Sequence, residues 1–152
     1  MNIKRIDPWL IDKVFQPVSD RFEKETRENN FYLSYFFCAL GLGLAIVGDT
    51  ATTNFELGTA CFIIFIAFII YIHGIKMNYR RKSEQNPGIA NPEKTNAYQI
   101  VMRQCSLFIC IVLGVIFPAT TVEYDKGTLF YGFSVFSATA SLYFAACTPL
   151  PD

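Results

Sequence analysis

The sequence predicts an all-α membrane protein with four transmembrane helices. They would form two tandem helical hairpins of the same orientation, preceded by an amphipathic N-terminal helix. Residues 57–75, LGTACFIIFIAFIIYIHGI, contain no charged residue and no polar stripe. At 1.5 Å per residue this stretch is about 28 Å long, close to the hydrocarbon thickness of a bilayer. The chain is 52% hydrophobic and 17% charged, whereas ordinary soluble domains carry roughly 25% charged residues.

Charge is distributed unevenly along the chain, and the distribution predicts the topology. Of the 13 basic residues, all but Lys126 lie in the N-terminal segment, in the central polar connection or at the start of the third apolar stretch. By the positive-inside rule, both termini and the central connection are expected in the cytoplasm, with the lipid bilayer around the helices. The basic and acidic residues, 13 of each, cancel, so we expect no nucleic-acid partner.

Hydropathy and charge together divide the chain into segments. An amphipathic segment (1–30) precedes a first transmembrane hairpin (31–75). A cytoplasmic connection (76–99) then leads to a second hairpin (100–147) and a short tail (148–152). The loop inside each hairpin is short and is expected to face outward.

The N-terminal segment has helical signals of its own. Asp7 and Pro8 are typical of a helix start, with Asp7 as N-cap, and Pro17 should kink or divide the helix. Trp9 together with aliphatic residues suits a helix lying among lipid headgroups. A helix packed on the rest of the protein, or on a partner, explains the same pattern, and both interpretations stay open. The apolar positions that recur every four residues are Ile6, Leu10, Val14, Val18 and Phe22.

The EKETREN run that follows can continue this helix, with Glu23 and Arg27 paired at i,i+4, up to a first membrane helix at 31–48. The second half of that membrane helix is rich in small residues, in two small-xxx-small spacings that let another backbone approach closely. These helix-packing residues are Ala39 with Gly43 and Gly41 with Ala45.

The third and fourth apolar stretches, 98–117 and 127–147, carry the remaining polar signals. Arg103 lies near the start of the third, where we expect it to snorkel to the interface. In the fourth, small residues recur at i, i+4 and i+8, which predicts a contact face. That stripe, Ser137, Ser141 and Ala145, could pack on the first helix, pack on another protein, or line a pore.

The two hairpins resemble each other in sequence. Residues 55–59, FELGT, match residues 124–128, YDKGT, and residues 44–47, LAIV, match residues 113–116, LGVI, at the same offset. Both first blocks read aromatic, acidic, any residue, Gly, Thr. The repeat therefore predicts two similarly oriented hairpins related by an axis along the membrane normal.

The second loop resembles that of the YiaA/YiaB two-helix-domain family. The match is carried by Ala119-Thr120 and Asp125-Lys126-Gly127, and the resemblance covers residues 39–147. The first loop departs from the family because it lacks the Lys, and the N-terminal segment is extra. The resemblance implies a multi-pass protein of the bacterial inner membrane with no assigned reaction.

Side chains near the expected membrane surfaces give three sets of candidate ligands. Residues expected at lipid headgroups are Trp9, Arg80, Arg81 and Lys82. Four acids are expected in the outward loops. They could bind a divalent cation, or they could lie at helix ends for solvation and because the helix dipole favours them there. These acids are Asp49, Glu56, Glu123 and Asp125. His73 could ligate a metal together with cysteines at the same depth, but an interfacial histidine is the favoured interpretation, and we expect no cofactor.

We expect no enzyme, because the chain has no Walker, HExxH or GxSxG motif. The favoured interpretation is an accessory or scaffold subunit of a membrane complex, or a homo-oligomer, that acts by contact. One alternative is a holin-like pore former or membrane-disrupting protein that uses the stripe of the fourth helix. Another is a cofactor-binding membrane protein that uses His73 and Cys38, Cys105 and Cys147.

The topology is testable with single cysteines in a cysteine-free background. A cysteine at Thr52 should react with an impermeant maleimide added outside cells, because its loop is predicted to face outward. A cysteine at Gln85 should react only after the cells are opened. Equal labelling of both positions in intact cells would contradict the predicted orientation.

Overall fold

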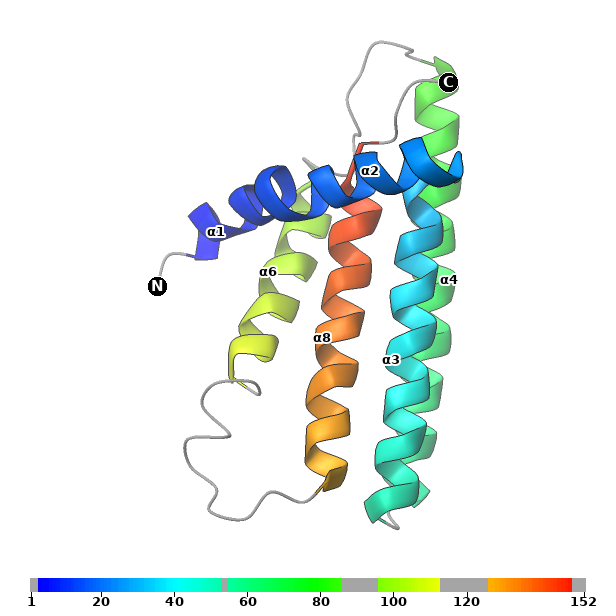
Figure 1. Cartoon of the computed structure of the whole chain (residues 1–152), viewed down its shortest axis with the longest axis vertical. Coiled ribbons are helices and arrows are strands. Elements are labelled where there is room, and N and C mark those ends of the chain that lie inside the picture. The colour runs from blue at the N-terminus through cyan, green and yellow to red at the C-terminus, as the bar shows by residue number, and fades with distance from the viewer. Residues whose placement is uncertain (1–2, 53–54, 86–95, 113–125, 149–152) are drawn as a thin grey trace.

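The computed structural model describes residues 3–52, 55–85, 96–112 and 126–148, and every regular element in these ranges is helical (Figure 1). The predicted all-α fold is confirmed for this part of the chain. Four rods stand side by side, and the N-terminal helices lie across one end of them (Figure 1). The rods are α3 (Asn30–Thr52), α4 (Phe55–Gln85), α6 (Ala97–Ile111) and α8 (Lys126–Ala146).

Two stretches among the described residues are long and apolar enough to cross a membrane, Asn30–Gly48 in α3 and Leu129–Ala146 in α8. Ala97–Ile111 is a shorter apolar helix. The helix that begins at Phe55 continues to Gln85, so the first part of the predicted connection is helical.

The N-terminal arm is α1 (Ile3–Leu10), a π-helical turn η1 (Ile11–Phe15) and α2 (Gln16–Thr26). The prediction that Asp7 caps the start of a helix is wrong, because α1 already includes Asp7 and Pro8. Pro17 occupies the first turn of α2, directly after the π-helical turn. There the N–H of Gln16 donates to the carbonyl of Ile11, five residues back. The wider turn makes room for the proline ring, so the arm stays continuous.

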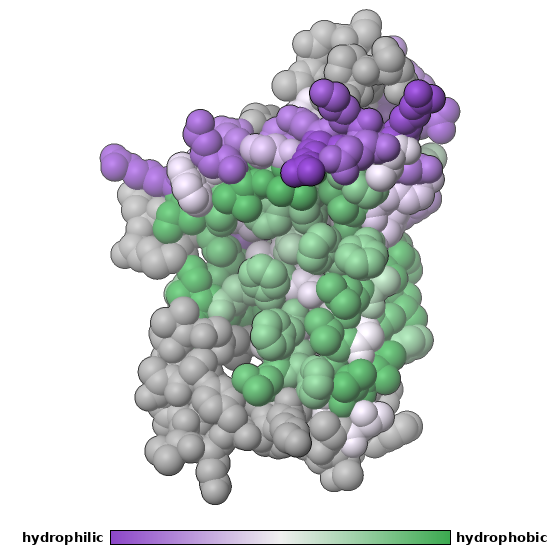
Figure 2. Space-filling view, viewed as in Figure 1, coloured by the Kyte–Doolittle hydropathy of each residue, from purple (hydrophilic) through white to green (hydrophobic). Residues whose placement is uncertain are grey.

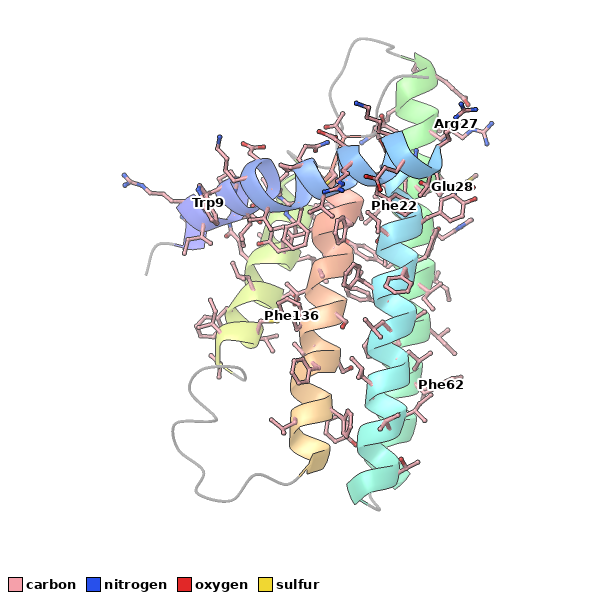
Figure 3. The ribbon with its side chains drawn as sticks, viewed as in Figure 1. Trp9, Phe22, Arg27, Glu28, Phe62 and Phe136 are labelled. Atoms are coloured by element: carbon pink, nitrogen blue, oxygen red, sulfur yellow. The ribbon has the colours of Figure 1, made fainter. Side chains whose placement is uncertain are left out.

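The arm ends earlier than the sequence predicted. Arg27 adopts the left-handed conformation, with φ 59°, and its N–H donates to the carbonyl of Glu23 at 2.8 Å. Figure 3 shows Arg27 and Glu28 at this corner, where the chain turns from the arm into α3. The Glu23 carboxylate accepts a hydrogen bond from the Asn30 backbone N–H at 2.6 Å. Glu23 therefore caps the start of the next helix.

The contact between α3 and α8 is antiparallel and keeps one register over its length. The Ser34 hydroxyl donates to the carbonyl of Ser141 at 2.7 Å, and the Ser134 hydroxyl donates to the carbonyl of Gly41 at 2.8 Å. Seven residues forward on α3 thus correspond to seven residues back on α8. Because both bonds join a side chain to a backbone carbonyl, the two backbones lie close together. The buried small or polar residues of α3 form one seam, Asn30, Ser34, Cys38, Gly41 and Ala45.

The two small-xxx-small spacings of α3 point in different directions. Gly41 and Ala45 are buried, and a Cβ on Gly41 would lie 2.7 Å from a ring carbon of Phe65 and 3.1 Å from the carbonyl oxygen of Ser134. Ala39 and Gly43 are exposed, and a Cβ on Gly43 would meet nothing within 4 Å. Only one spacing therefore serves packing inside the chain.

Gly41→Ala should lower the free energy of unfolding by about 2 kcal/mol, because the added methyl would overpack against the Phe65 ring of α4 and the Ser134 carbonyl of α8. Gly43→Ala is the matched control, and it should leave stability unchanged or raise it by up to about 1 kcal/mol through helix propensity. Both are measured by chemical unfolding of the detergent-solubilised protein. Equal effects of the two substitutions would contradict the assigned register.

Candidate functional site at the junction of the arm and the bundle

A buried ion pair joins the arm to the bundle. The Arg103 guanidinium donates through Nε to Asp7 Oδ1 at 3.0 Å and through Nη2 to Asp7 Oδ2 at 3.1 Å. The side chains are only 1% and 4% exposed. Two parallel bonds of this kind are the strongest geometry available to arginine and a carboxylate. We call this pair the clasp.

Arg103 lies on the second turn of α6, and the start of that helix is fixed locally. The Asn96 side chain accepts a hydrogen bond from the N–H of Tyr98 at 3.1 Å, a regular N-cap. Four residues before Arg103, the side chain of Gln99 is also buried. The expectation that Arg103 snorkels to an interface is wrong, because the arm covers it and supplies its counterion.

Polar contacts continue along the boundary between α6 and α8. Thr139 of α8 bonds through its hydroxyl to the hydroxyl of Ser106, and it lies 3.0 Å from the sulfur of Cys110. Arg103, Ser106 and Cys110 are three and four residues apart, so they share one face of α6. Clasp and hydroxyl contacts together hold α1, α6 and α8 to one another.

A second set of contacts docks the arm on the end of α8. The Phe15 ring stacks on Tyr143 with ring centroids 4.8 Å apart and meets Phe144 edge-on at 5.0 Å. The Gln16 amide both donates to and accepts from the backbone of Thr148, each at 2.9 Å. The Asn30 amide donates to the carbonyls of Phe144 at 2.9 Å and Cys147 at 2.8 Å. These side chains satisfy carbonyls that the end of a helix leaves without partners.

The docked face of the arm overlaps only in part with the apolar row of the sequence. Leu10 of that row is partly buried against the cluster that contains Tyr143 and Ala146, whereas Val14 and Val18 are 39% and 49% exposed. Most residues that meet the bundle lie one position further along, about 100° around the helix. The arm residues that are buried, or partly buried against the bundle, include Asp7, Leu10, Ile11, Phe15, Ser19 and Glu23.

The arm therefore has a docked face, an apolar exposed face and a charged outer face. Figure 2 shows hydrophilic residues on its outer side and a hydrophobic surface directly beneath them, continuous with the bundle. Trp9 is 56% exposed at the N-terminal end of the arm (Figure 3). On the outer side, Arg21 donates to Glu25 at 2.8 Å, and this neighbour raises the pKa of the guanidinium. Both earlier interpretations of the arm, docking on the bundle and lying among headgroups, are compatible with this arrangement.

The other predicted ligands are placed as follows. Arg80 and Arg81 are exposed on the last turns of α4, and Arg80 pairs with Glu84 at 3.2 Å. Lys82 is half-buried beside them. His73 is exposed, with its Nδ1 3.1 Å from the hydroxyl of Tyr35. Within the described ranges, no group of three or more His, Cys, Asp or Glu side chains is placed to hold a metal ion.

The remaining predicted site residues divide into two groups. Ser137, Ser141 and Ala145 are buried on α8, and Ser141 receives the hydrogen bond from Ser34. The predicted cation ligands lie outside what the structure describes in side-chain detail. Asp49 and Glu56 belong to α3 and α4, but their side chains are not described, and Glu123 and Asp125 fall outside the described residues.

Sequence reasoning did not find the clasp. Asp7 had an adequate local explanation as an N-cap, and Arg103 had one as an interfacial residue. One signal was available, since a charged residue inside an apolar helix needs a partner. The sequence offered several acids and no way to choose among them.

Comparison with known protein families, with curated proteins and with solved structures finds no match to this chain. The resemblance to the YiaA/YiaB family stays a prediction. The part of the chain that the structure describes defines a helical protein, with two stretches long and apolar enough to span a membrane and an N-terminal arm fastened by a buried ion pair.

Removing one member of the clasp should be costly, because the other charge stays buried without its counterion. Asp7→Asn should lower the free energy of unfolding by about 3 kcal/mol, and Arg103→Met by a similar amount. The double variant Asp7→Leu with Arg103→Met should recover most of the loss, since an apolar pair needs no counterion. Unfolding in detergent measures all three. Additive losses in the double variant would show that the two side chains do not act as a pair.

Proposed function

We propose that this chain is a small multi-pass protein of the bacterial inner membrane, with α3, α4, α6 and α8 crossing the bilayer as two tandem hairpins and both termini in the cytoplasm. It would act by contact, as an accessory or scaffold subunit of a membrane complex or as a homo-oligomer. The observations that support this proposal concern its outer surface and the way its polar groups are used.

Among the described residues, each of the four rods exposes large apolar side chains. Figure 2 shows a broad hydrophobic face below the charged arm, and Figure 3 shows Phe62 pointing away from α4. Soluble monomers rarely expose apolar patches larger than a few hundred Å², whereas a lipid environment requires such a surface. The large hydrophobic residues of the rods that are more than half exposed are Tyr32, Phe36, Ile63, Ile70, Met77, Tyr98, Val101, Phe108, Phe133 and Phe136.

The observation that carries the contact function is that the polar stripe of α8 is used inside the chain. Ser137 and Ser141 are buried. The Ser134 hydroxyl donates to the carbonyl of Gly41, and the backbone carbonyl of Ser141 accepts from the Ser34 hydroxyl. The Ser141 hydroxyl donates to the carbonyl of Ala138 in its own helix. A pore former would need these groups to face water when it assembles. Their engagement in the α3–α8 contact favours a rigid bundle whose outer surface is the part available to partners.

The outer face of α3 is the surface we expect a partner helix to meet. Ala39 and Gly43 are exposed at i,i+4, and space beside Gly43 is open. Their neighbour Leu40 is also exposed. Small residues flanked by larger ones on a membrane helix allow close backbone approach.

Purification from native membranes in mild detergent should yield a complex larger than one chain. Gly43→Leu should reduce recovery of that complex about tenfold, because the added side chain blocks close approach on α3. Gly74→Leu is the matched control on α4, where a Cβ also meets nothing within 4 Å, and it should leave recovery unchanged.

Two outcomes would contradict this proposal. One is a chain that migrates as a monomer in every mild detergent and crosslinks to nothing in membranes. The other is loss of membrane potential on overexpression, abolished by Ser137→Leu with Ser141→Leu, which would establish the pore-forming alternative.

A further inference from the structure

A lysine at the arm end of the α3–α4 hairpin is held by two aromatic rings. The ammonium of Lys76 lies 5.2 Å from the ring centroid of Tyr32 and 5.8 Å from that of Tyr35. Both distances are within the range of cation–π attraction. A lysine side chain is ordinarily free to move among many rotamers, so these contacts restrict where its charge is presented.

Two further polar groups lie beside this ammonium. The Tyr35 hydroxyl is 3.1 Å from Nδ1 of His73, and His73 precedes Lys76 by three residues on the same face of α4. His73 and Tyr32 are exposed, while Lys76 and Tyr35 are half-buried. The four side chains form one cluster on the surface between α3 and α4, which we call the Lys76 cluster.

Charge in the Lys76 cluster is not balanced by a neighbouring acid. No carboxylate of the described residues lies within ion-pair distance of Lys76. One turn further along α4, Arg80 is different, because it pairs with Glu84 at 3.2 Å. The Lys76 cluster therefore presents donors and a positive charge to whatever lies outside it, and an oxyanion is the complementary ligand.

We infer that the Lys76 cluster binds the phosphate of an anionic membrane phospholipid. The inference rests on the proposed membrane location. Tyr32 and Tyr35 lie in the first two turns of α3, at the end of the bundle that the arm crosses, where the hydrophobic surface gives way to the charged one (Figure 2). In a bilayer this is the depth of the phosphate groups.

A phospholipid fits this position better than a free phosphate ion. Phe36 is 60% exposed one turn beyond Tyr32, and Ile70 is 66% exposed one turn beyond His73, both on the side away from the arm. Acyl chains would cover these side chains while the phosphate meets Lys76. A free ion would leave them bare.

The test uses the full-length protein in mild detergent with equal amounts of phosphatidylglycerol and phosphatidylcholine of identical acyl chains. Native mass spectrometry then counts the lipids that remain bound. Wild type should retain phosphatidylglycerol preferentially. Lys76→Gln should weaken that retention about fivefold, the effect expected of one basic residue at a membrane surface. Tyr35→Phe, which keeps the ring and removes the hydroxyl, should have a smaller effect in the same direction.

Arg21→Gln is the matched control, because it removes the same charge from an exposed helical position already paired with a carboxylate, Glu25, at i,i+4. It should change retention less than twofold. Equal losses for Lys76→Gln and Arg21→Gln would show diffuse attraction to basic residues and overturn the site. Inorganic phosphate is added in a separate arm. Displacement of the lipid by millimolar phosphate would assign the site to the free ion and overturn the lipid.

Failure of the lipid site can be told apart from failure of the proposed membrane location. Trp9 is the single tryptophan of the chain, so quenching of its fluorescence by brominated phospholipids reports insertion without any substitution. Quenching without a preference for phosphatidylglycerol would overturn the Lys76 cluster alone. No quenching, from a protein that stays dissolved without detergent, would overturn the membrane location as well.

Discussion

The close antiparallel contact between α3 and α8 is the constraint on which the other features depend. Gly41 lets the backbones approach, and the bonds from Ser34 and Ser134 to carbonyls of the opposite helix fix one register. That register brings the end of α8 to the start of α3. There the Asn30 amide donates to the carbonyls of Phe144 and Cys147. Inside a bilayer no water competes for these hydrogen bonds. The register that brings the helices closest is therefore also the one that gives these polar groups their partners.

Docking of the arm follows from the same geometry. Because α8 ends beside Asn30, its last aromatic residues, Tyr143 and Phe144, form the platform on which Phe15 packs. With Phe15 in place, the arm runs toward α6, and Asp7 comes to lie against Arg103. The position of the clasp therefore depends on the α3–α8 contact, through the packing of Phe15 on the end of α8. Moving the arm away from the rods would leave a buried charge without its counterion, so the clasp opposes any other position of the arm relative to α6.

The surface left after these contacts is divided by depth. Hydrophilic residues occupy the outer side of the arm, and a hydrophobic surface lies beneath them (Figure 2). The Lys76 cluster lies beside the first turns of α3, at the end of the bundle that the arm crosses. This division by depth is the pattern that the proposed membrane location requires. On α3, Gly41 and Ala45 pack inside the chain, whereas Ala39 and Gly43 do not. The inward face of α3 thus packs within the bundle, while Ala39 and Gly43 on its outward face are exposed.

The sequence by itself determined the helical fold and the approximate position of each rod, because continuous apolar runs and helix-packing spacings are local properties of the chain. It also contained the residues of the α3 seam, without indicating whether Gly41 or Gly43 belonged to it. It left open whether the arm docks on the bundle or lies among headgroups, since a repeat of Val14 and Val18 every four residues is apolar whether it meets protein or lipid. Only the tertiary structure decided that Asp7 pairs with Arg103, that Glu23 caps α3 and that Lys76 lies over two tyrosine rings. Each of these contacts joins residues from different helices, and the energy that selects them depends on burial and distance, which no local pattern contains.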